Sequence, residues 1–436
     1  MTSVRHHRWA ALAGVVFLGT PAAVSAQGQP PLAVTLAEAI RRALDVQPAM
    51  VQARGETRNA GAGERSAWGA FLPTVNTSAS ASRSNTASFR SGTTDTLPPL
   101  YSYSGGLSAS LILFDGFNRF ANLRASAATQ DAAAAGLVSQ RYQTTFATQQ
   151  AFFAALADDE LVRVAEAQVQ RAREELQISV NKFQAGAATR SDTLTSTVDL
   201  GTARLALLQA QANLATAQAT LGRQIGVDQL VRAVPDTTVP PLPDTTALRA
   251  AALQTAPLVH QAEAQARAAG AQVWGARSQY WPSLIVSYNN SRTGTGSPTL
   301  PLFGGYPENF TWRFGLSWTL FNGLQREQAQ VSASVARDNA AAQAADARRQ
   351  VNAQLTQQLT ALSTASAQIG IAGANVEAAT EARRVQQERY RVGAATLLDL
   401  LTAEANLTQA QVNQVQARYN YFIAQAQLEA LVGHAL

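Results

Sequence analysis

The chain has 436 residues, of which 14% are charged, and a formal net charge of +5 at pH 7. This length is long for one compact core, and soluble domains carry roughly 25% charged residues, so we expect either several domains or an elongated architecture covered by small uncharged side chains. The absence of cysteine excludes a disulfide-stabilised fold, a thiolate zinc site and a lipid anchor on an N-terminal cysteine.

The first 26 residues are organised like a cleaved secretory signal. Arg5 and Arg8 precede an apolar run at 9–19, and small residues lead to a cleavage site near Ala26. Cleavage lowers the net charge from 34 − 29 = +5 to 32 − 29 = +3. We attribute the remaining positive charge to a general preference for arginine, since Lys182 is the single lysine, and we expect no nucleic-acid partner. Because no later apolar run reaches about 18 residues, the secreted chain is expected in the periplasm, outside the cell, or in the outer membrane as strands.

The first unit, residues 27–230, is predicted to run helix, helix, strand, strand, long helix, helix. Pro48 ends the first helix, because proline restricts the residue before it, and Pro73 opens the first strand. The predicted bounds are 36–46 and 49–70 for the short helices, 73–82 and 101–114 for the strands, 117–184 for the long helix, and 192–225 for the last helix.

A Pro-rich joint, residues 231–246, separates this unit from a second one at 247–436. The joint contains VPDTTVPPLPDTT at 234–246, a composition that forbids a helix or a central strand. The second unit is predicted to repeat the same order of elements, with helices at 247–256 and 258–280, strands at 283–291 and 310–321, a long helix at 324–391 and a last helix at 397–432.

The two units are copies of one pattern. Pro73 matches Pro282 at an offset of 209 residues, and LFDGF at 113–117 matches LFNGL at 320–324 at an offset of 207. The segment KFQAGAATRSDTL at 182–194 matches RYRVGAATLLDLL at 389–401 at the same offset of 207. The mature chain is therefore predicted to be two tandem structural repeats.

The strands alternate between large apolar and small polar side chains. This period of two indicates a strand with one apolar and one polar face, which is typical of a membrane barrel with aromatic girdles. A soluble sandwich strand is the alternative, but it needs a facing sheet that the chain hardly supplies. The side chains expected to face the membrane are Tyr101, Tyr103, Phe310, Trp312, Phe314 and Trp318.

Long polar loops at 82–100 and 291–309 join the paired strands and are expected outside the cell. Four strands cannot close a barrel, since the smallest membrane barrels have about eight. Closure then requires neighbouring chains, so a homo-oligomer is expected: a dimer would supply eight strands and a trimer twelve.

Each long helix is uninterrupted by proline and would reach about 100 Å at 1.5 Å per residue. That is about three times the hydrocarbon thickness of a bilayer, so these helices are expected to stand outside the membrane. Leu355, Leu359, Leu362, Ile369 and Val376 follow a spacing typical of a coiled coil. Two shorter helices, placed end to end, could run antiparallel along each long one.

These features resemble the TolC-type outer-membrane efflux channels. The likeness covers nearly the whole mature chain, from TLAEAIRRALDVQPAM through FLPTV, YWPSL, LFDG, LFNG and YRVGAATLLDLL to ARYNYFIAQAQLEALVG. It implies a mainly α-helical fold with a small transmembrane β part, in which a trimer builds a twelve-stranded outer-membrane β-barrel and a periplasmic α-helical barrel. It also implies an exit duct for an inner-membrane transporter of RND or ABC type, or for a type I secretion system, docked through a periplasmic adaptor protein.

Gly186 and Gly393 are expected to be tip turns, because glycine adopts the left-handed conformation at low cost. After each glycine, a threonine and an aspartate have the spacing of a helix-capping box; the pairs are Thr189 with Asp192 and Thr396 with Asp399. Both aspartates could be caps alone.

By resemblance, Asp399 corresponds to an acidic ring at the pore entrance. Tyr390 and Asp192 correspond to a contact that holds neighbouring helices closed. Two positions depart from the well-known member, because Thr402 replaces a second acidic residue and Ala395 replaces a gating arginine. Cation selectivity and the tightness of the closed state are therefore left open by the sequence.

No enzymatic activity, cofactor or metal is expected. His260 and His434 are the histidines left after signal removal, and no nucleotide-binding glycine motif or histidine–glutamate cluster is present. A secreted structural or adhesive coiled-coil protein, with the Trp-rich strands as an assembly edge, remains the alternative from another functional class.

Overall fold

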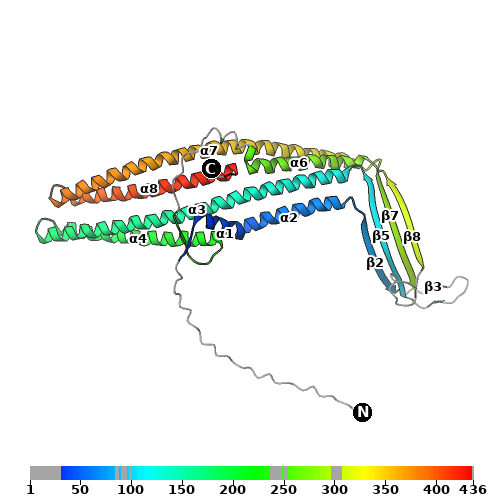
Figure 1. The fold of residues 1–436 in the computed structure, drawn as a ribbon, viewed down its shortest axis with the longest axis horizontal. Coiled ribbons are helices and arrows are strands. Elements are labelled where there is room, and N and C mark those ends of the chain that lie inside the picture. Colours follow the sequence, from blue (N-terminus) through cyan, green and yellow to red (C-terminus); the bar gives the residue numbers. More distant parts are fainter. Residues whose placement is uncertain are drawn as a thin grey trace, which may run out of the picture.

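The computed structural model describes residues 31–83, 88–89, 96–97, 101–235, 248, 254–295 and 307–434. The expected signal at 1–26 lies outside these residues, as do most of the expected helix at 247–256, most of the Pro-rich joint and most of both polar loops. The described chain is a rod of helices with a small sheet at one end (Figure 1). The prediction of a mainly helical fold with a small β part is confirmed.

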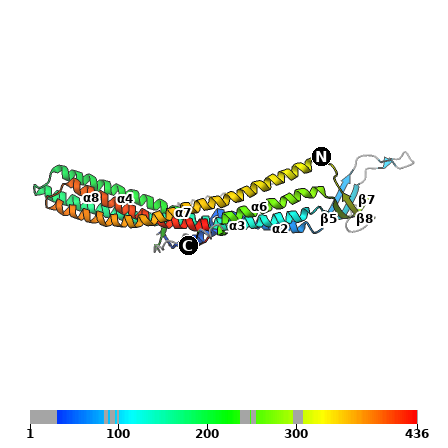
Figure 2. The ribbon, with the colours of Figure 1, turned by 90° about the horizontal axis from the view of Figure 1, so that it is seen from above.

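Two helices of 67 residues form the length of the rod. They are α3, Asn118–Gln184, and α7, Gln325–Arg391. The helices α2, Pro48–Gly69, and α4, Arg190–Ile225, pack along α3, while α6, Pro257–Arg277, and α8, Leu397–Val432, pack along α7. Each long helix therefore has a shorter helix beside each of its halves, and Figure 2 shows the same arrangement from above.

The two repeats meet along α3, which also contacts α6 and α8 of the second repeat. Near the middle of the rod lies the main core, where Phe152 and Phe153 of α3 pack with Leu355 and Leu362 of α7 and Phe422 of α8. The central part of the leucine series expected to form a coiled coil is therefore buried inside one chain.

A short parallel ribbon beside this core was not predicted. It pairs β1, Leu32–Val34, with β6, Val231–Ala233, and it lies next to α1, Leu36–Val46. The assignment of the joint to start at residue 231 was therefore wrong, because Val231 and Ala233 are buried and pair as a strand. Strands of three residues are too short to show alternation in the sequence.

The sheet is antiparallel with the order β2–β5–β7–β8. The strands are β2, Thr74–Arg83, β5, Tyr101–Asp115, β7, Ser283–Thr295, and β8, Glu308–Ser317; a separate two-stranded piece pairs β3, Ser88–Phe89, with β4, Thr96–Leu97. The pairing of β5 with β7 joins the two repeats, and β2 and β8 are left as edges.

The last strand is shorter at one end than predicted and β7 is longer. Alternation suggested a strand at 310–321, but β8 ends at Ser317, opposite the first residue of β7, Ser283. Beyond this point no residue of β7 is available, and the Arg326 guanidinium binds the carbonyls of Thr319 and Leu320 instead. The strand predicted at 283–291 continues to Thr295, within the segment assigned to a loop.

Candidate functional site at the helical tip

Both reversals at the far end of the rod are Schellman turns. In the first, Gly186 has a φ of 71°, and the Ala187 amide donates to the carbonyl of Lys182 at 2.8 Å. In the second, Gly393 has a φ of 81°, and the Ala394 amide donates to the carbonyl of Arg389 at 2.7 Å. The left-handed glycine ends each long helix and satisfies its last carbonyls.

A reciprocal capping box begins the helix after each turn. The Thr189 amide donates to Asp192 Oδ2 at 2.9 Å, and the Asp192 amide donates to Thr189 Oγ1 at 3.2 Å. The second box has the same two bonds, at 2.9 Å and 3.2 Å, between Thr396 and Asp399. Its threonine hydroxyl also lies 2.7 Å from Asp399 Oδ2.

Asp399 lies exposed at the tip. Hydrogen bonds from Thr396 hold the pKa of the Asp399 carboxyl below its usual range, and the nearby Arg389 acts in the same direction. This carboxyl is therefore negatively charged at neutral pH. A fixed negative charge facing water can act on ions that pass the tip, and it can equally well serve as a helix cap.

Tyr390 is buried between the two helical hairpins of the chain, α3–α4 and α7–α8. Its ring packs with Leu397 and Leu400, and Lys182 of α3 lies 3.9 Å from the ring centroid and donates a hydrogen bond to the Tyr390 carbonyl. Burial raises the pKa of the tyrosine, and the charge of Asp192 adds to this effect. In the described chain the Tyr390 hydroxyl makes no hydrogen bond to Asp192, and the cation–π contact with Lys182 links the hairpins at this point instead.

A buried cluster of charges behind the tip was not predicted from the sequence. Glu404 of α8 binds Arg171 of α3 at 2.7 Å and also binds Arg383 of α7, and the three side chains are only 11–19% exposed. Arg171 donates a further bond to Thr408 at 3.0 Å. A signal was present, because Glu404 follows Leu397 and Leu400 on one helix face, at spacings of seven and four residues, where an apolar residue is expected.

Glu175 of α3 lies beside this cluster and is 1% exposed. Its Oε1 atom has no hydrogen-bond partner among the described residues. Burial raises the pKa of Glu175 to about 8, and the negative charges of Glu404 and of Asp199 on α4 act in the same direction. The four helices behind the tip therefore each contribute a charge to one buried group.

The residues expected to face the membrane lie at the opposite end, on the sheet. Register places Phe314 opposite Val286 and Trp312 opposite Tyr288 on one face, while Arg313 opposes Ser287 on the other. The sheet therefore has one apolar and one polar face. The six side chains lie on its strands or just beyond them; five are 47–72% exposed in the chain, namely Tyr101, Phe310, Trp312, Phe314 and Trp318, and Tyr103 stacks on Tyr101.

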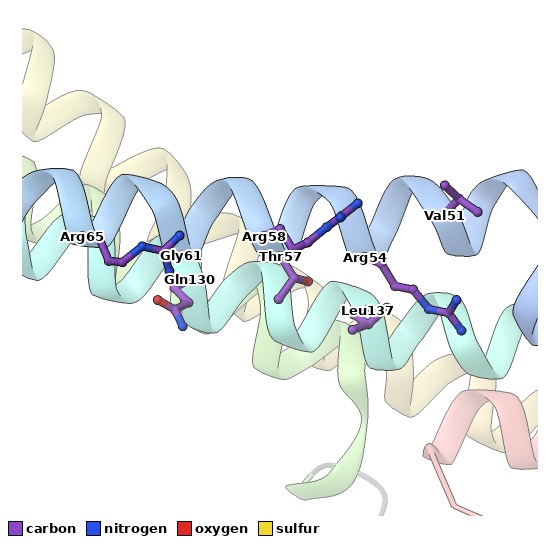
Figure 3. A pocket seen from close by; sticks show the side chains of 8 residues that line it. All are labelled: Val51, Arg54, Thr57, Arg58, Gly61, Arg65, Gln130 and Leu137. Carbon is purple, nitrogen blue, oxygen red and sulfur yellow. The ribbon is translucent and has the colours of Figure 1, made fainter.

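A cavity on the helical rod is a different feature. It is an open groove of about 750 Å³ between α2 and α3, lined by Arg54, Arg58 and Arg65 together with Gln130 and Leu137 (Figure 3). It lies on the half of the rod nearer the sheet (Figure 1) and contains none of the tip residues. Arg54 is bound to the Leu44 carbonyl at 2.9 Å, so the groove is not an enclosed pocket with converging free groups.

In the part of the chain that the structure describes, no group of three or more histidine, aspartate or glutamate side chains is placed to hold a metal ion. None of the described helices is both long and apolar enough to cross a membrane.

Comparison with known proteins gives a consistent result. A family model described as outer membrane efflux protein matches residues 39–227 and 248–434. The outer membrane efflux protein BepC of Brucella suis biovar 1 (strain 1330) is 24% identical over 406 residues, which cover 91% of this chain and 85% of BepC.

Solved structures show the same fold. The outer membrane protein VceC of Vibrio cholerae superposes with a TM-score of 0.79 at 20% identity, covering 92% of this chain and 96% of VceC. The outer membrane channel MtrE of Neisseria gonorrhoeae, in an open state, gives a TM-score of 0.76 at 18% identity, covering 92% of this chain and 89% of MtrE.

Proposed function

The chain belongs to the outer membrane efflux protein family, and from this premise we propose that it is the outer-membrane exit duct of a tripartite efflux pump or of a type I secretion system. The family is one of passive channels and not of enzymes. In this role the protein would conduct substrates from an inner-membrane transporter across the periplasm and the outer membrane, and the energy would come from that transporter.

The proposal rests on a difference between two equivalent helices: α3 has more neighbouring helices within the described chain than α7 has. Within the chain, α3 contacts α2 and α4 of its own repeat and also α6 and α8 of the other repeat. Its equivalent α7 packs on α6 and α8, and no described helix of the same chain occupies the positions that correspond to the second pair. The helices α2 and α4 of another copy are the elements that fit there.

The sheet shows the same difference, because β5 pairs with β7 of the other repeat whereas its equivalent β8 is an edge strand. The in-chain pair β5–β7 corresponds to a pairing of β8 with β2 of another copy, because β8 repeats β5 and β2 repeats β7. Edge strands with free backbone groups are strong sites for pairing with another chain. Applied repeatedly, this junction forms a ring, and three copies would give twelve strands, which is enough to close a membrane barrel.

In this assembly the aromatic face of the sheet would contact outer-membrane lipid. The helical rod would extend into the periplasm and present the tip turns to a periplasmic adaptor and to a transporter of RND or ABC type. Asp399 would then form a ring of three carboxylates at the entrance, with Tyr390 and Asp192 near the helices that close it. The capping boxes support this role by fixing Asp399 and Asp192 at the start of their helices.

Fractionation and gel migration test this proposal. We expect the processed protein, cut near Ala26, in the outer-membrane fraction, and we expect it to migrate as an oligomer on SDS gels until heating converts it to monomer. The purified protein should form ion-conducting channels in planar bilayers. A soluble filament, recovered without detergent and without heat-dependent migration, would instead support a secreted structural or adhesive protein.

A further inference from the structure

One charged side chain, Arg313 of β8, lies on the polar face of the sheet among hydroxyl groups. Its partners across the sheet are, in order, Ser287 of β7, Ser110 of β5 and Thr74 of β2. The Arg313 side chain is exposed, and its guanidinium forms no ion pair or hydrogen bond with any other described residue. Its five N–H donors are therefore free to bind a molecule in front of this face.

Arg313 borders a cavity of about 230 Å³ on this face. Hydroxyl and amide side chains form the rest of its polar lining, namely Ser108, Ser110, Ser287, Asn289, Ser291 and Thr311. None of the described residues that line the cavity is an aspartate or a glutamate. A guanidinium surrounded by hydroxyl donors, with no negative charge beside it, is a favourable environment for a carboxylate or a phosphate group.

Two pairs of opposite charges lie near the ends of the sheet, and each pair is neutral. On the aromatic face, Arg292 of β7 binds Glu308 of β8 at 3.0 Å. On the polar face, at the end next to the helices, Asp115 of β5 binds Arg119 at 3.3 Å, and these side chains are only 15% and 11% exposed. Arg313 is therefore the one unneutralised charge on the polar face of the described strands.

The repeat places hydroxyl groups on the other side of Arg313 as well. Subtracting 207 from Arg313 gives Gly106 of β5, which lies opposite Ser291 of β7. Subtracting 209 from Ser291 gives Ser82 of β2, which is therefore expected opposite Arg313 in the next copy and which itself lies opposite Ser102. Because Gly106 has no side chain, this arrangement would occur once in each chain, where β8 meets the next copy.

We propose that Arg313 and the hydroxyl groups around it form an oxyanion-binding site in the lumen of the duct, which favours the passage of solutes that carry a carboxylate or a phosphate. This inference rests on the proposed function, since the polar face encloses a lumen only when several copies close the barrel. The aromatic face would contact lipid, so the ligand of Arg313 is a dissolved anion and not a lipid head group. Three copies would place three guanidinium groups around one level of the lumen.

Planar-bilayer recordings of the purified protein test the charge and the binding site separately. The effect of the charge is measured as the reversal potential across a KCl gradient at low ionic strength, because the Debye length is about 10 Å at 0.1 M salt and shorter at higher concentrations. Binding is measured as the saturable reduction of the chloride current when inorganic phosphate is added.

Arg313→Gln should shift the reversal potential toward cation preference and should raise the phosphate concentration needed for half of the reduction several-fold. Arg313→Lys keeps the charge but lacks the planar fork that binds an oxyanion through two N–H groups, so it should preserve the reversal potential and weaken the response to phosphate. Arg83→Gln is the matched control, because Arg83 lies on the aromatic face, 5.4 Å from the ring centroid of Tyr101. It removes the same charge and should change neither measurement.

A response to phosphate that is absent from the natural channel, or that Arg313→Gln leaves unchanged, would overturn the proposed site even if the reversal potential moves. Equal changes in Arg313→Gln and Arg83→Gln would also contradict it, since the two side chains lie on opposite faces. Heat-dependent migration on SDS gels verifies that each variant assembles. Failure of the natural protein to form channels at all would count against the proposed function instead, so the two failures can be told apart.

Discussion

Burial of the Glu175 carboxyl disfavours its negatively charged form. Its pKa is raised from 4.5 to about 8, so the folded state retains the proton where the unfolded state has lost it. Because the folded state binds more protons in this range, its stability falls as pH rises from about 4.5 to about 8 and then stays level.

Glu175→Gln should remove most of this dependence. We expect the thermal midpoint of the variant, measured in detergent between pH 4 and pH 9, to exceed that of the natural protein most clearly above pH 8. The exposed neighbour Glu174, changed to Gln, serves as the control and should leave the pH profile unchanged. An unaltered decline in the Glu175 variant would show that another group causes it.

Asp399 is the residue on which ion preference at the tip should depend. Asp399→Ala removes three exposed charges from the proposed ring and should lower the cation preference measured as a reversal potential across a salt gradient. Thr396→Ala is the control for capping, since loss of the N-cap costs about 0.5–2 kcal/mol while the carboxylate remains. If Thr396→Ala alters selectivity as much as Asp399→Ala does, the aspartate is a helix cap only.

At the scale of elements, the two equivalent strand-to-helix turns differ in what packs against their glycines. Gly116 has a φ of 65°, and a Cβ there would lie 2.5 Å from the Ser278 carbonyl oxygen, in the short helix η1, Ser278–Tyr280, of the second repeat. Its equivalent, Gly323, has a φ of 67°, and no atom of the described chain outside its own turn lies within 4 Å of the position that a Cβ would take. In the proposed ring, the turn after α2 of the next copy would fill that space.

This difference predicts two distinct defects. Gly116→Ala should lower the fraction of chain that folds, because the contact is internal and the backbone is strained. Gly323→Ala should leave the helical content by circular dichroism near that of the natural chain while lowering the fraction of oligomer on unheated gels. Equal loss of helix in the two variants would contradict a neighbour at Gly323.

The helices could be predicted closely because their signals are local. Proline is absent between 117 and 184, and glycine marks the reversal, so the expected helix 117–184 differs by one residue from Asn118–Gln184. The end of β8 could not be predicted, since the alternation continues to Leu320 although the partner strand begins at Ser283. The ion cluster at Glu404 was missed because its local signal, a charge at an apolar position of α8, does not identify its partners on α3 and α7.

At the scale of the whole molecule, the repeat predicts the register between copies. In the chain, Ser108 of β5 lies opposite Asn289 of β7. Adding 207 to Ser108 gives Gly315 of β8, and subtracting 209 from Asn289 gives Ser80 of β2. These two residues are therefore expected to lie opposite each other, with Ser80 in the next copy. Gly315→Cys with Ser80→Cys should therefore form a disulfide between chains, seen as a ladder on non-reducing gels.

A shifted pair provides the control for this register. Gly315→Cys with Val75→Cys places the second thiol five residues away along β2 and on its other face. We expect no ladder from this pair. A ladder from the shifted pair, and none from the matched pair, would mean that β8 meets β2 in another register.

The mass of the intact assembly in detergent tests the central claim most directly. Native mass spectrometry of the processed protein should give three copies of the chain, which together supply the twelve strands of one barrel. A single chain that stays in solution without detergent would contradict the shared channel and the export role that depends on it.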